Sequence, residues 1–375
     1  MAVEQIDIEK FLGLSNKFPV LDVRSPGEFS HAHIPGALAL PLFTDEQRKI
    51  IGTAYKQESR QIAVDIGLQY FSCRMQTIAA QTEEMIKPWI GEVEGRSSKN
   101  IPLLVHCWRG GMRSGAVAWL LNLYGFKVYT LRGGYKSFRN WVLSQFEKEY
   151  QLSIVGGYTG SGKTDLLHEM RKKGQFVVDL ERLANHKGSA FGSMGEQPQP
   201  GQEMFENLLA MSLYECETTN SESNGGGYPS ESKEVWLEDE SRHIGTVGIP
   251  NKFWDQMRRS PLYFLDIPFD ERLKKIIGTY GNFDRDQLIN ATKRIEKRLG
   301  GLETKKAIQY LEADNITESF SILLKYYDKL YSNSLLKREN LGEVLNKIAF
   351  PTVDIRNAEM FCNQKAWQTL NTKGA

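Results

Sequence analysis

The sequence has few cysteines, and none stands in a metal-binding arrangement. Its 375 residues include four of them: Cys73, Cys107, Cys216 and Cys362. No two form a Cys-x-x-Cys pair, which argues against a zinc site or a disulfide framework. We therefore expect a reducing, cytoplasmic setting in which a free reactive thiol persists.

Membrane segments and a dominant charge are also missing. No apolar run approaches the roughly 20 residues that span a bilayer, and the acidic first residues lack the apolar core of a secretory signal. Lys and Arg (47) nearly balance Asp and Glu (46), so no global charge attracts nucleic acid. The length predicts two or three domains, and the hydrophobic content of 41% is ordinary for a soluble globular protein.

One segment nevertheless carries a local excess of positive charge. Residues 272–306 contain only four acidic residues. The basic residues are Arg272, Lys274, Lys275, Arg285, Lys293, Arg294, Lys297, Arg298, Lys305 and Lys306. Two interpretations stand at this point: a solvated helix face, or a surface that contacts the phosphate backbone of a nucleic acid.

Residues 1–142 are predicted to form a parallel α/β domain, because short apolar runs alternate with helix-like segments. Buried strands are expected at 18–24, 101–106 and 127–131, and a helix at 114–124. Residues 44–89 have helical character and are predicted to be an insertion between strands.

Residues 143–375 are predicted to form a second α/β domain with a helical C-terminal part. A connecting helix is expected at 141–150, and the pattern turns helical after Asp270. Residues 218–233 are rich in Ser, Asn, Gly and Glu, and a disordered surface loop is expected there. Strands are predicted at 152–156, 176–180, 234–238 and 262–266.

The first candidate site is residues 107–114, CWRGGMRS, here called the cysteine loop. It connects a predicted strand to a predicted helix, so loop amides and a helix N-terminus converge on one anion site. That field favours the thiolate of Cys107. Arg109 and Arg113 would add charge-assisted hydrogen bonds to a bound oxyanion or persulfide. These three residues are the predicted catalytic set; the alternative is a buried structural cysteine at a strand end.

The second candidate site is residues 157–164, GYTGSGKT, here called the phosphate loop. The spacing Gly-x4-Gly-Lys-Thr between a predicted strand and a predicted helix is that of a P-loop. Lys163 would reach the terminal phosphate, and Thr164 would hold Mg²⁺. The predicted phosphate- or diphosphate-binding residues are Gly157, Gly160, Gly162, Lys163 and Thr164.

A carboxylate that assists the metal is expected at the end of a later strand. Asp179, Glu238, Asp239 and Asp266 all satisfy this condition, and the sequence does not choose among them. Residues 238–242, EDESR, are polar enough to be either a site or a surface segment, with Glu238 and Asp239 as predicted supporting residues.

Four segments of the first domain together resemble a rhodanese domain. They are residues 22–29 (DVRSPGEF), 33–37 (HIPGA), the cysteine loop and 131–135 (LRGGY). The resemblance implies that Cys107 carries sulfur or selenium. Asp22 and Arg24 are expected to brace the loop from the neighbouring strand. The Cys-x5-Arg-Ser spacing also fits cysteine phosphatases.

A rhodanese domain followed directly by a P-loop domain resembles the bacterial tRNA 2-selenouridine synthases. Further similarity lies in residues 52–57 (GTAYKQ), 132–136 (RGGYK), 180–192 and 236–245 (WLEDESRHIG). The family acts on 2-thiouridine at the wobble position of tRNA. It replaces sulfur by selenium from selenophosphate, and it attaches a geranyl group from geranyl diphosphate, which makes S-geranyl-2-thiouridine the expected intermediate.

The resemblance implies a role for each site. Cys107 would attack or hold selenium, and the phosphate loop would bind the diphosphate leaving group, with Lys163 and Mg²⁺ on Thr164 stabilising its charge. The basic stretch would contact the tRNA backbone. Either Trp108 or Tyr158 would stack on the uridine.

Three other functions remain open from the residues alone. The first is a rhodanese-type sulfurtransferase fused to a P-loop kinase or nucleotide-binding module. The second is a Cys-x5-Arg phosphatase with a nucleotide-binding partner domain. The third is a non-enzymatic module in which nucleotide binding acts as a switch.

Overall fold

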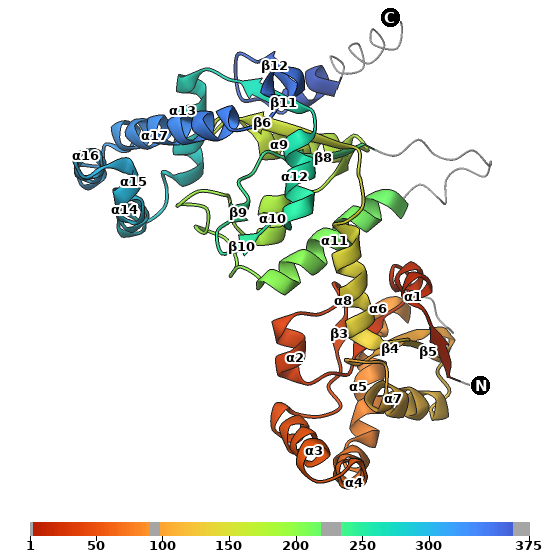
Figure 1. Ribbon diagram of the computed structural model, residues 1–375. Coiled ribbons are helices and arrows are strands. Elements are labelled where there is room, and N and C mark those ends of the chain that lie inside the picture. Colours follow the sequence, from red (N-terminus) through yellow and green to blue (C-terminus); the bar gives the residue numbers. More distant parts are fainter. Residues whose placement is uncertain (1–2, 91–97, 219–233, 363–375) are drawn as a thin grey trace, which may run out of the picture. The chain divides into compact units, whose positions relative to one another are not determined.

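The computed structural model describes residues 3–90, 98–218 and 234–362. The chain forms two compact units (Figure 1). The first comprises Met1–Gln145 with Glu206–Leu208, and the second comprises Phe146–Phe205 with Leu209–Ala375. Within the described ranges, no helix is both long enough and apolar enough to cross a membrane.

The first unit is built on a five-stranded parallel sheet with the order β1-β5-β4-β2-β3. Its strands are β1 (Glu4–Ile6), β2 (Val20–Asp22), β3 (Leu38–Ala39), β4 (Leu103–His106) and β5 (Val128–Leu131). The helices are α1 (Ile8–Ser15), α2 (Pro26–His31), α3 (Asp45–Gln57), α4 (Arg60–Ser72), α5 (Met75–Met85), α6 (Lys87–Ile90), α7 (Met112–Leu123) and α8 (Gly134–Gln145).

Helices cover the sheet, and its central strands are therefore buried throughout. Every residue of β2, β4 and β5 is buried, as expected for parallel strands with both faces covered. Helix α7 packs on β4 and β5 and also contacts α5. Helices α1 and α8 contact each other and β5. The predicted helical insertion at 44–89 is confirmed as α3 to α6.

The second unit holds another five-stranded parallel sheet, with the order β12-β11-β6-β8-β7. Its strands are β6 (Leu152–Gly157), β7 (Phe176–Val177), β8 (Val235–Glu238), β11 (Leu262–Asp266) and β12 (Leu345–Ala349), and a hairpin consists of β9 (His243–Ile244) and β10 (Val247–Gly248). Its first helices are α9 (Lys163–Lys172), α10 (Leu180–Ala184), α11 (Gln202–Thr218) and α12 (Asn251–Arg259). The predicted fold class, two parallel α/β domains, is confirmed.

The C-terminal part of the second unit is mainly helical, as expected. Helices α14, α15 and α16 gather beside the long helix α17 in Figure 1, and α16 contacts both α14 and α17. These helices are α13 (Phe269–Tyr280), α14 (Arg285–Arg294), α15 (Glu296–Leu299), α16 (Gly301–Glu312), α17 (Ile316–Leu336) and α18 (Leu341–Val344).

Three predicted elements are wrong in detail. Strand β12 interrupts the helical region and pairs with β11, a long-range contact that helical periodicity does not reveal. Strand β7 ends at Val177, because the Asp179 side chain accepts a hydrogen bond from the Arg182 amide and begins α10. The helix expected at 141–150 starts earlier, at Gly134, and ends at Gln145. Most of the predicted disordered loop, residues 219–233, lies outside the described residues.

A buried ion pair holds the end of β2. Arg24 and Asp22 are 1% and 0% exposed, and the Arg24 guanidinium makes bonds of 2.7–3.0 Å to both carboxylate oxygens of Asp22. Arg24 also donates to the Ala32 carbonyl and lies 3.8 Å from the centre of the Tyr135 ring. Burial alone would raise the pKa of Asp22, but the charges of His106 and Arg24 outweigh it, so that pKa is lowered.

Removing one partner of this pair should destabilise the first unit. We expect Asp22→Ala to reduce the free energy of unfolding by about 3–5 kcal/mol in urea, because it leaves the Arg24 charge buried without its counter-ion. The exposed pair Glu4–Lys10 provides the control, and Glu4→Ala should leave the unfolding curve unchanged. Equal curves for both variants would contradict this assignment.

Candidate active sites

Cys107 follows the last residue of β4 and is 3% exposed. Its Sγ lies 3.2 Å from the Ser114 Oγ, and the Ser114 hydroxyl donates its one proton to the Gly111 carbonyl oxygen at 3.2 Å. Ser114 is itself buried, in the first turn of α7. Rotation of this hydroxyl from the Gly111 carbonyl to the sulfur would let it donate to a Cys107 thiolate.

Glycine is required where the cysteine loop meets the start of α8. Gly110 has φ +63°, and a Cβ there would lie 2.4 Å from the Leu131 carbonyl oxygen. Gly134 has φ +60°, and its Cβ would lie 2.3 Å from the Cys107 carbonyl oxygen. The Tyr135 amide donates to that same carbonyl at 2.8 Å. The two loops thus pack backbone to backbone, which explains the RGGY segment.

The amides of the cysteine loop are available to a ligand. In the part of the chain that the structure describes, no amide from Trp108 to Ser114 donates to a protein acceptor. The amides of the loop and of the first helical turn are a common anion-binding arrangement. The loop therefore offers the unpaired amides that an anion site at Cys107 would need.

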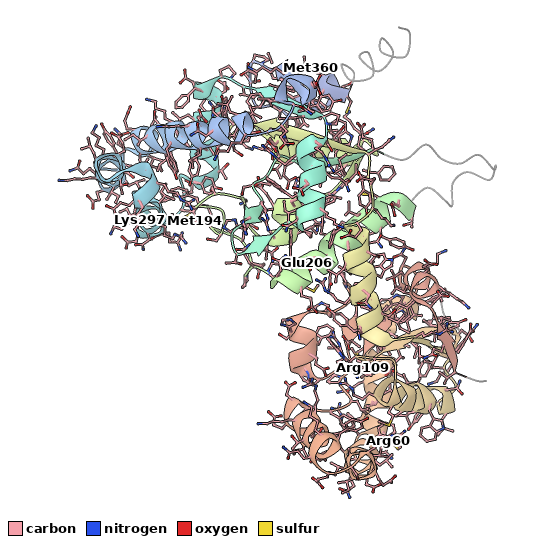
Figure 2. All side chains as sticks on the ribbon, in the orientation of Figure 1. Arg60, Arg109, Met194, Glu206, Lys297 and Met360 are labelled. Carbon is pink, nitrogen blue, oxygen red and sulfur yellow. The ribbon has the colours of Figure 1, made fainter. Side chains whose placement is uncertain are left out.

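The two predicted arginines of the loop differ in position. Arg113 donates to both carboxylate oxygens of Glu28, at 2.7 and 3.3 Å, and Arg48 also pairs with Glu28. Burial alone would raise the pKa of Glu28, but its bonds with Arg113 lower it. Arg109 lies exposed in the loop (Figure 2). Arg113 is therefore fixed, whereas Arg109 is accessible to a bound anion.

The predicted bracing residues lie beneath the loop. The Nε2 of His106, which precedes Cys107, is 3.7 Å from an Asp22 carboxylate oxygen. Burial lowers the pKa of His106, and the nearby Asp22 carboxylate opposes that shift. Arg24 contacts both Asp22 and the Tyr135 ring. The side chains of Asp22, Arg24 and His106 thus form one buried polar cluster at the ends of β2 and β4.

The phosphate loop follows β6 and leads into α9, as the sequence predicts. All three predicted glycines have positive φ: Gly157 at 148°, Gly160 at 82° and Gly162 at 79°. The Lys163 ammonium donates to the Gly157 carbonyl at 2.9 Å, which folds it over the loop. Thr164 Oγ1 donates to Glu181 at 3.2 Å.

Helix α17 braces the phosphate loop. Tyr331 accepts a hydrogen bond from the Gly157 amide and donates one to Asp239 at 2.7 Å. Arg272 makes two bonds of 2.8 Å to Asp328 and donates to the Thr159 carbonyl. This network holds the backbone of the phosphate loop in place. The sequence does not predict it, because the paired residues are far apart in the chain.

The carboxylate that lies next to Thr164 is none of the four candidates from the sequence. Glu181, on α10, is the acceptor of the Thr164 hydroxyl, and its amide donates to Glu238 at the end of β8. Asp239 is bound by Tyr331 and Arg338, and Asp179 pairs with His168 at 2.6 Å. Sequence reasoning missed Glu181 because it lies on a helix after a strand end.

These carboxylates share a small volume. Burial and the charge of Asp179 raise the pKa of Glu238, and burial and the charge of Glu181 raise the pKa of Glu240 to about 8. In the described ranges, no three His, Cys, Asp or Glu side chains are grouped as a metal site. Asp239, Glu240 and Ser241 line the cavity that includes the phosphate loop, and Glu238 accepts a hydrogen bond from the Glu181 amide, so most of the EDESR segment adjoins this loop.

A cavity of about 1220 Å³ opens from the phosphate loop. Its lining includes the polar residues Lys163, Thr164, Glu181 and Glu240. Apolar and aromatic side chains line it elsewhere: Ile276, Tyr280, Ile295, Tyr326, Tyr327 and Leu330. The cavity is thus large enough for a diphosphate with an apolar chain.

The basic stretch divides into paired and accessible residues. Arg272 is buried and braces the phosphate loop, so it is not part of a nucleic-acid surface, which corrects that part of the prediction. Ion pairs also hold Lys274, Lys275, Arg285 and Lys306. Three exposed residues on α14 and α15 line the cavity, with no ion pair in the described chain, and are here called the basic rim: Arg294, Lys297 and Arg298 (Lys297 is labelled in Figure 2).

The two aromatic residues proposed to stack on uridine have different surroundings. Tyr158 packs edge-on against Phe264 and Tyr331, and its hydroxyl lies 3.1 Å from the Ser332 Oγ. Trp108 is 38% exposed beside Cys107. Accessibility favours Trp108, and Tyr158 is part of the brace of the phosphate loop.

Comparisons with known proteins match the chain in both halves. A family described as "tRNA 2-selenouridine synthase AAA domain" matches residues 150–347, and the family described as "Rhodanese-like domain" matches residues 7–140. A tRNA 2-selenouridine synthase of Nitrosomonas europaea is 31% identical over 85% of this chain and 90% of its own length. One of Marinobacter nauticus is 32% identical over 90% of this chain and 94% of its own length.

The close backbone contact at Gly110 can be tested by substitution, with the adjacent Gly111 as the control. Gly110→Ala should destabilise the first unit by at least about 1–3 kcal/mol in urea, because of the positive φ alone, and should change the rate at which an alkylating agent modifies Cys107. An added Cβ at Gly111 meets nothing within 4 Å, so Gly111→Ala should stay within about 0.5 kcal/mol of wild type. The packing described here would be refuted if the two variants behaved alike.

Proposed function

Because the chain belongs to the tRNA 2-selenouridine synthase family, we propose that it is a tRNA-modifying transferase of the cytoplasm. Its substrate is the wobble 2-thiouridine of tRNA. It attaches a geranyl group from geranyl diphosphate to the sulfur, and then replaces the S-geranyl group by selenium from selenophosphate. One observation carries this proposal: the chain holds two glycine loops between a strand and a helix, one with a thiol and one with a lysine and a carboxylate.

Geranyl transfer is assigned to the phosphate loop. The thiocarbonyl sulfur of the uridine attacks C1 of geranyl diphosphate, the C–O bond breaks, and diphosphate leaves. Lys163, released from the Gly157 carbonyl, neutralises the growing charge of that leaving group together with the loop amides. The apolar side chains of the same cavity, such as Ile276, Ile295 and Leu330, suit the geranyl chain.

The oxygen atoms around Thr164 fit a magnesium ion. Mg²⁺ prefers oxygen ligands and usually takes few from the protein, the rest coming from phosphates and water. The Thr164 hydroxyl would be one ligand, with the Glu181 carboxylate at its side. The ion would supply additional positive charge for the departing diphosphate.

Selenium transfer is assigned to the cysteine loop. The unpaired amides from Trp108 to Ser114, together with Arg109, fit the oxyanion of selenophosphate. Cys107 is the nucleophile that acts on this donor, and the Ser114 hydroxyl lies next to its sulfur. Trp108, exposed beside the thiol, offers a stacking surface for the uridine base.

Contact with tRNA is assigned to the basic rim. Arg294, Lys297 and Arg298 are exposed, and they border the cavity that holds the phosphate loop. Backbone phosphates of an anticodon loop bound there would bring the wobble nucleotide to the diphosphate. Tyr326, which lines the same cavity, adds an aromatic face for an unstacked base.

The division of labour is tested by two variants. Cys107→Ala should abolish selenation and leave geranylation within about twofold of wild type. Lys163→Ala should slow geranylation about 10²-fold, the usual loss for one transition-state donor. Mass spectrometry of digested nucleosides would measure both products from thiolated tRNA, geranyl diphosphate and selenophosphate.

Lys172→Ala is the control for Lys163→Ala, because Lys172 lies exposed on the same helix. It should leave both products unchanged. Absence of both products with the wild-type protein would refute the proposed function. Equal loss of both steps in Cys107→Ala and Lys163→Ala would refute the assignment of one step to each loop.

The basic rim gives a separate prediction. Arg294→Glu combined with Arg298→Glu should weaken tRNA binding at least about tenfold and reduce its salt dependence. The control double variant, Lys293→Glu with Lys305→Glu, makes the same charge change at exposed residues of the same stretch that do not line the cavity. Filter-binding measurements at several salt concentrations should show a much smaller effect. If both double variants bind equally weakly, the effect is one of net charge, and the rim assignment is wrong.

A further inference from the structure

The cysteine loop is equipped for chemistry at phosphorus. Its spacing is Cys-x5-Arg-Ser, and its free amides from Trp108 to Ser114 fit the oxygens of a phosphoryl group. The Cys107 sulfur lies 3.2 Å from the Ser114 hydroxyl, and Glu28 fixes Arg113 in the first turn of α7. The proposed function does not say which atom of selenophosphate the thiolate attacks, and these features bear on that choice.

The thiolate could attack either selenium or phosphorus, and the two reactions differ in their electron balance. Selenium in selenophosphate is already at the level of selenide. Attack of a thiolate on selenium would form an S–Se bond and leave the electron pair of the P–Se bond on phosphorus, as phosphite. The S–Se pair would then need a two-electron reductant before selenide reached the uridine. Attack on phosphorus needs neither oxidant nor reductant.

We propose that the Cys107 thiolate attacks phosphorus, so that an S–P bond forms, the P–Se bond breaks, and hydrogen selenide leaves. The hydrogen selenide anion then attacks C2 of the S-geranyl uridine: a C–Se bond forms, the C–S bond breaks, and geranyl thiolate leaves. The proton on selenium moves to N3, which gives 2-selenouridine. Water hydrolyses the phosphocysteine, which releases phosphate and the Cys107 thiolate. The inference rests on the proposed function and names the bond that Cys107 breaks.

The charge state of Glu28 agrees with a selenide leaving group. An alkoxide that leaves a phosphate ester needs a proton from a general acid. Glu28, the carboxylate bound to Arg113, is held ionised, because its bonds with Arg113 lower its pKa despite burial. Hydrogen selenide is a much weaker base than an alkoxide and leaves as an anion. The loop is therefore suited to selenophosphate and poorly suited to alkyl phosphates.

Ser114 acts as a positioning residue in the second half of this cycle. When water attacks the phosphocysteine, the Cys107 thiolate becomes the leaving group. The Ser114 hydroxyl, 3.2 Å from the sulfur, then turns from the Gly111 carbonyl and donates to it. Loss of this hydroxyl should slow hydrolysis more than formation of the phosphocysteine. Ser114→Ala should therefore accumulate the intermediate.

The test uses the full chain and selenophosphate alone, without tRNA. The Ser114→Ala variant is mixed with selenophosphate and denatured rapidly, and the Cys107 peptide is weighed by mass spectrometry. We expect the mass of one phosphoryl group on Cys107, and none in Cys107→Ser combined with Ser114→Ala. Cys73→Ser in the Ser114→Ala background should keep the full signal, because Cys73 is exposed and outside the loop.

A second measurement does not depend on the stability of any variant. Wild-type protein should release phosphate and alkylation-trapped selenide in equal amounts, and should leave an alkyl phosphate intact. Selenium on Cys107 together with released phosphite would overturn the inference, as would wild-type formation of 2-selenouridine with no phosphocysteine in Ser114→Ala. A wild-type protein that forms phosphocysteine but neither modified uridine would refute the proposed function and leave this inference standing.

Discussion

The structure depends on one constraint of parallel α/β units: where a strand ends and a helix begins, the first amides of the helix have no partner within that helix. After β4 and after β6, tight glycine loops with positive φ lead into these helices, at Gly110 and at Gly157 to Gly162. The rest of each unit holds those loops in shape. In the first unit the α8 start packs against the cysteine loop through Gly134, and in the second unit Tyr331 and Arg272 brace the phosphate loop.

Side chains then give the two loops different chemistry. Beside the first stand a thiol and a hydroxyl, Cys107 and Ser114, which suit formation and cleavage of a bond to sulfur. Beside the second stand Lys163, Thr164 and Glu181, which suit a diphosphate that must leave with its charge neutralised. Both proposed reactions are group transfers without net oxidation, so neither loop requires a redox partner.

Local motifs were predictable from the sequence, and their supports were not. Cys107 and the phosphate loop are identified by spacing within eight residues, and the strands before them by apolar runs. Glu181, strand β12 and the Arg272–Asp328 pair depend on residues far apart in the chain, and periodicity carries no information about them. Arg272 illustrates the difference: composition placed it on a basic surface, whereas its partner Asp328, on α17, keeps it buried.

The central claim is that each anion-binding loop performs one step. It is tested most directly by supplying the intermediate: tRNA that already carries S-geranyl-2-thiouridine, with selenophosphate, to the Lys163→Ala variant. The account predicts 2-selenouridine at the wild-type rate, because the phosphate loop is no longer needed. Loss of selenation in this variant, measured by mass spectrometry of the nucleosides beside a wild-type control, would contradict it.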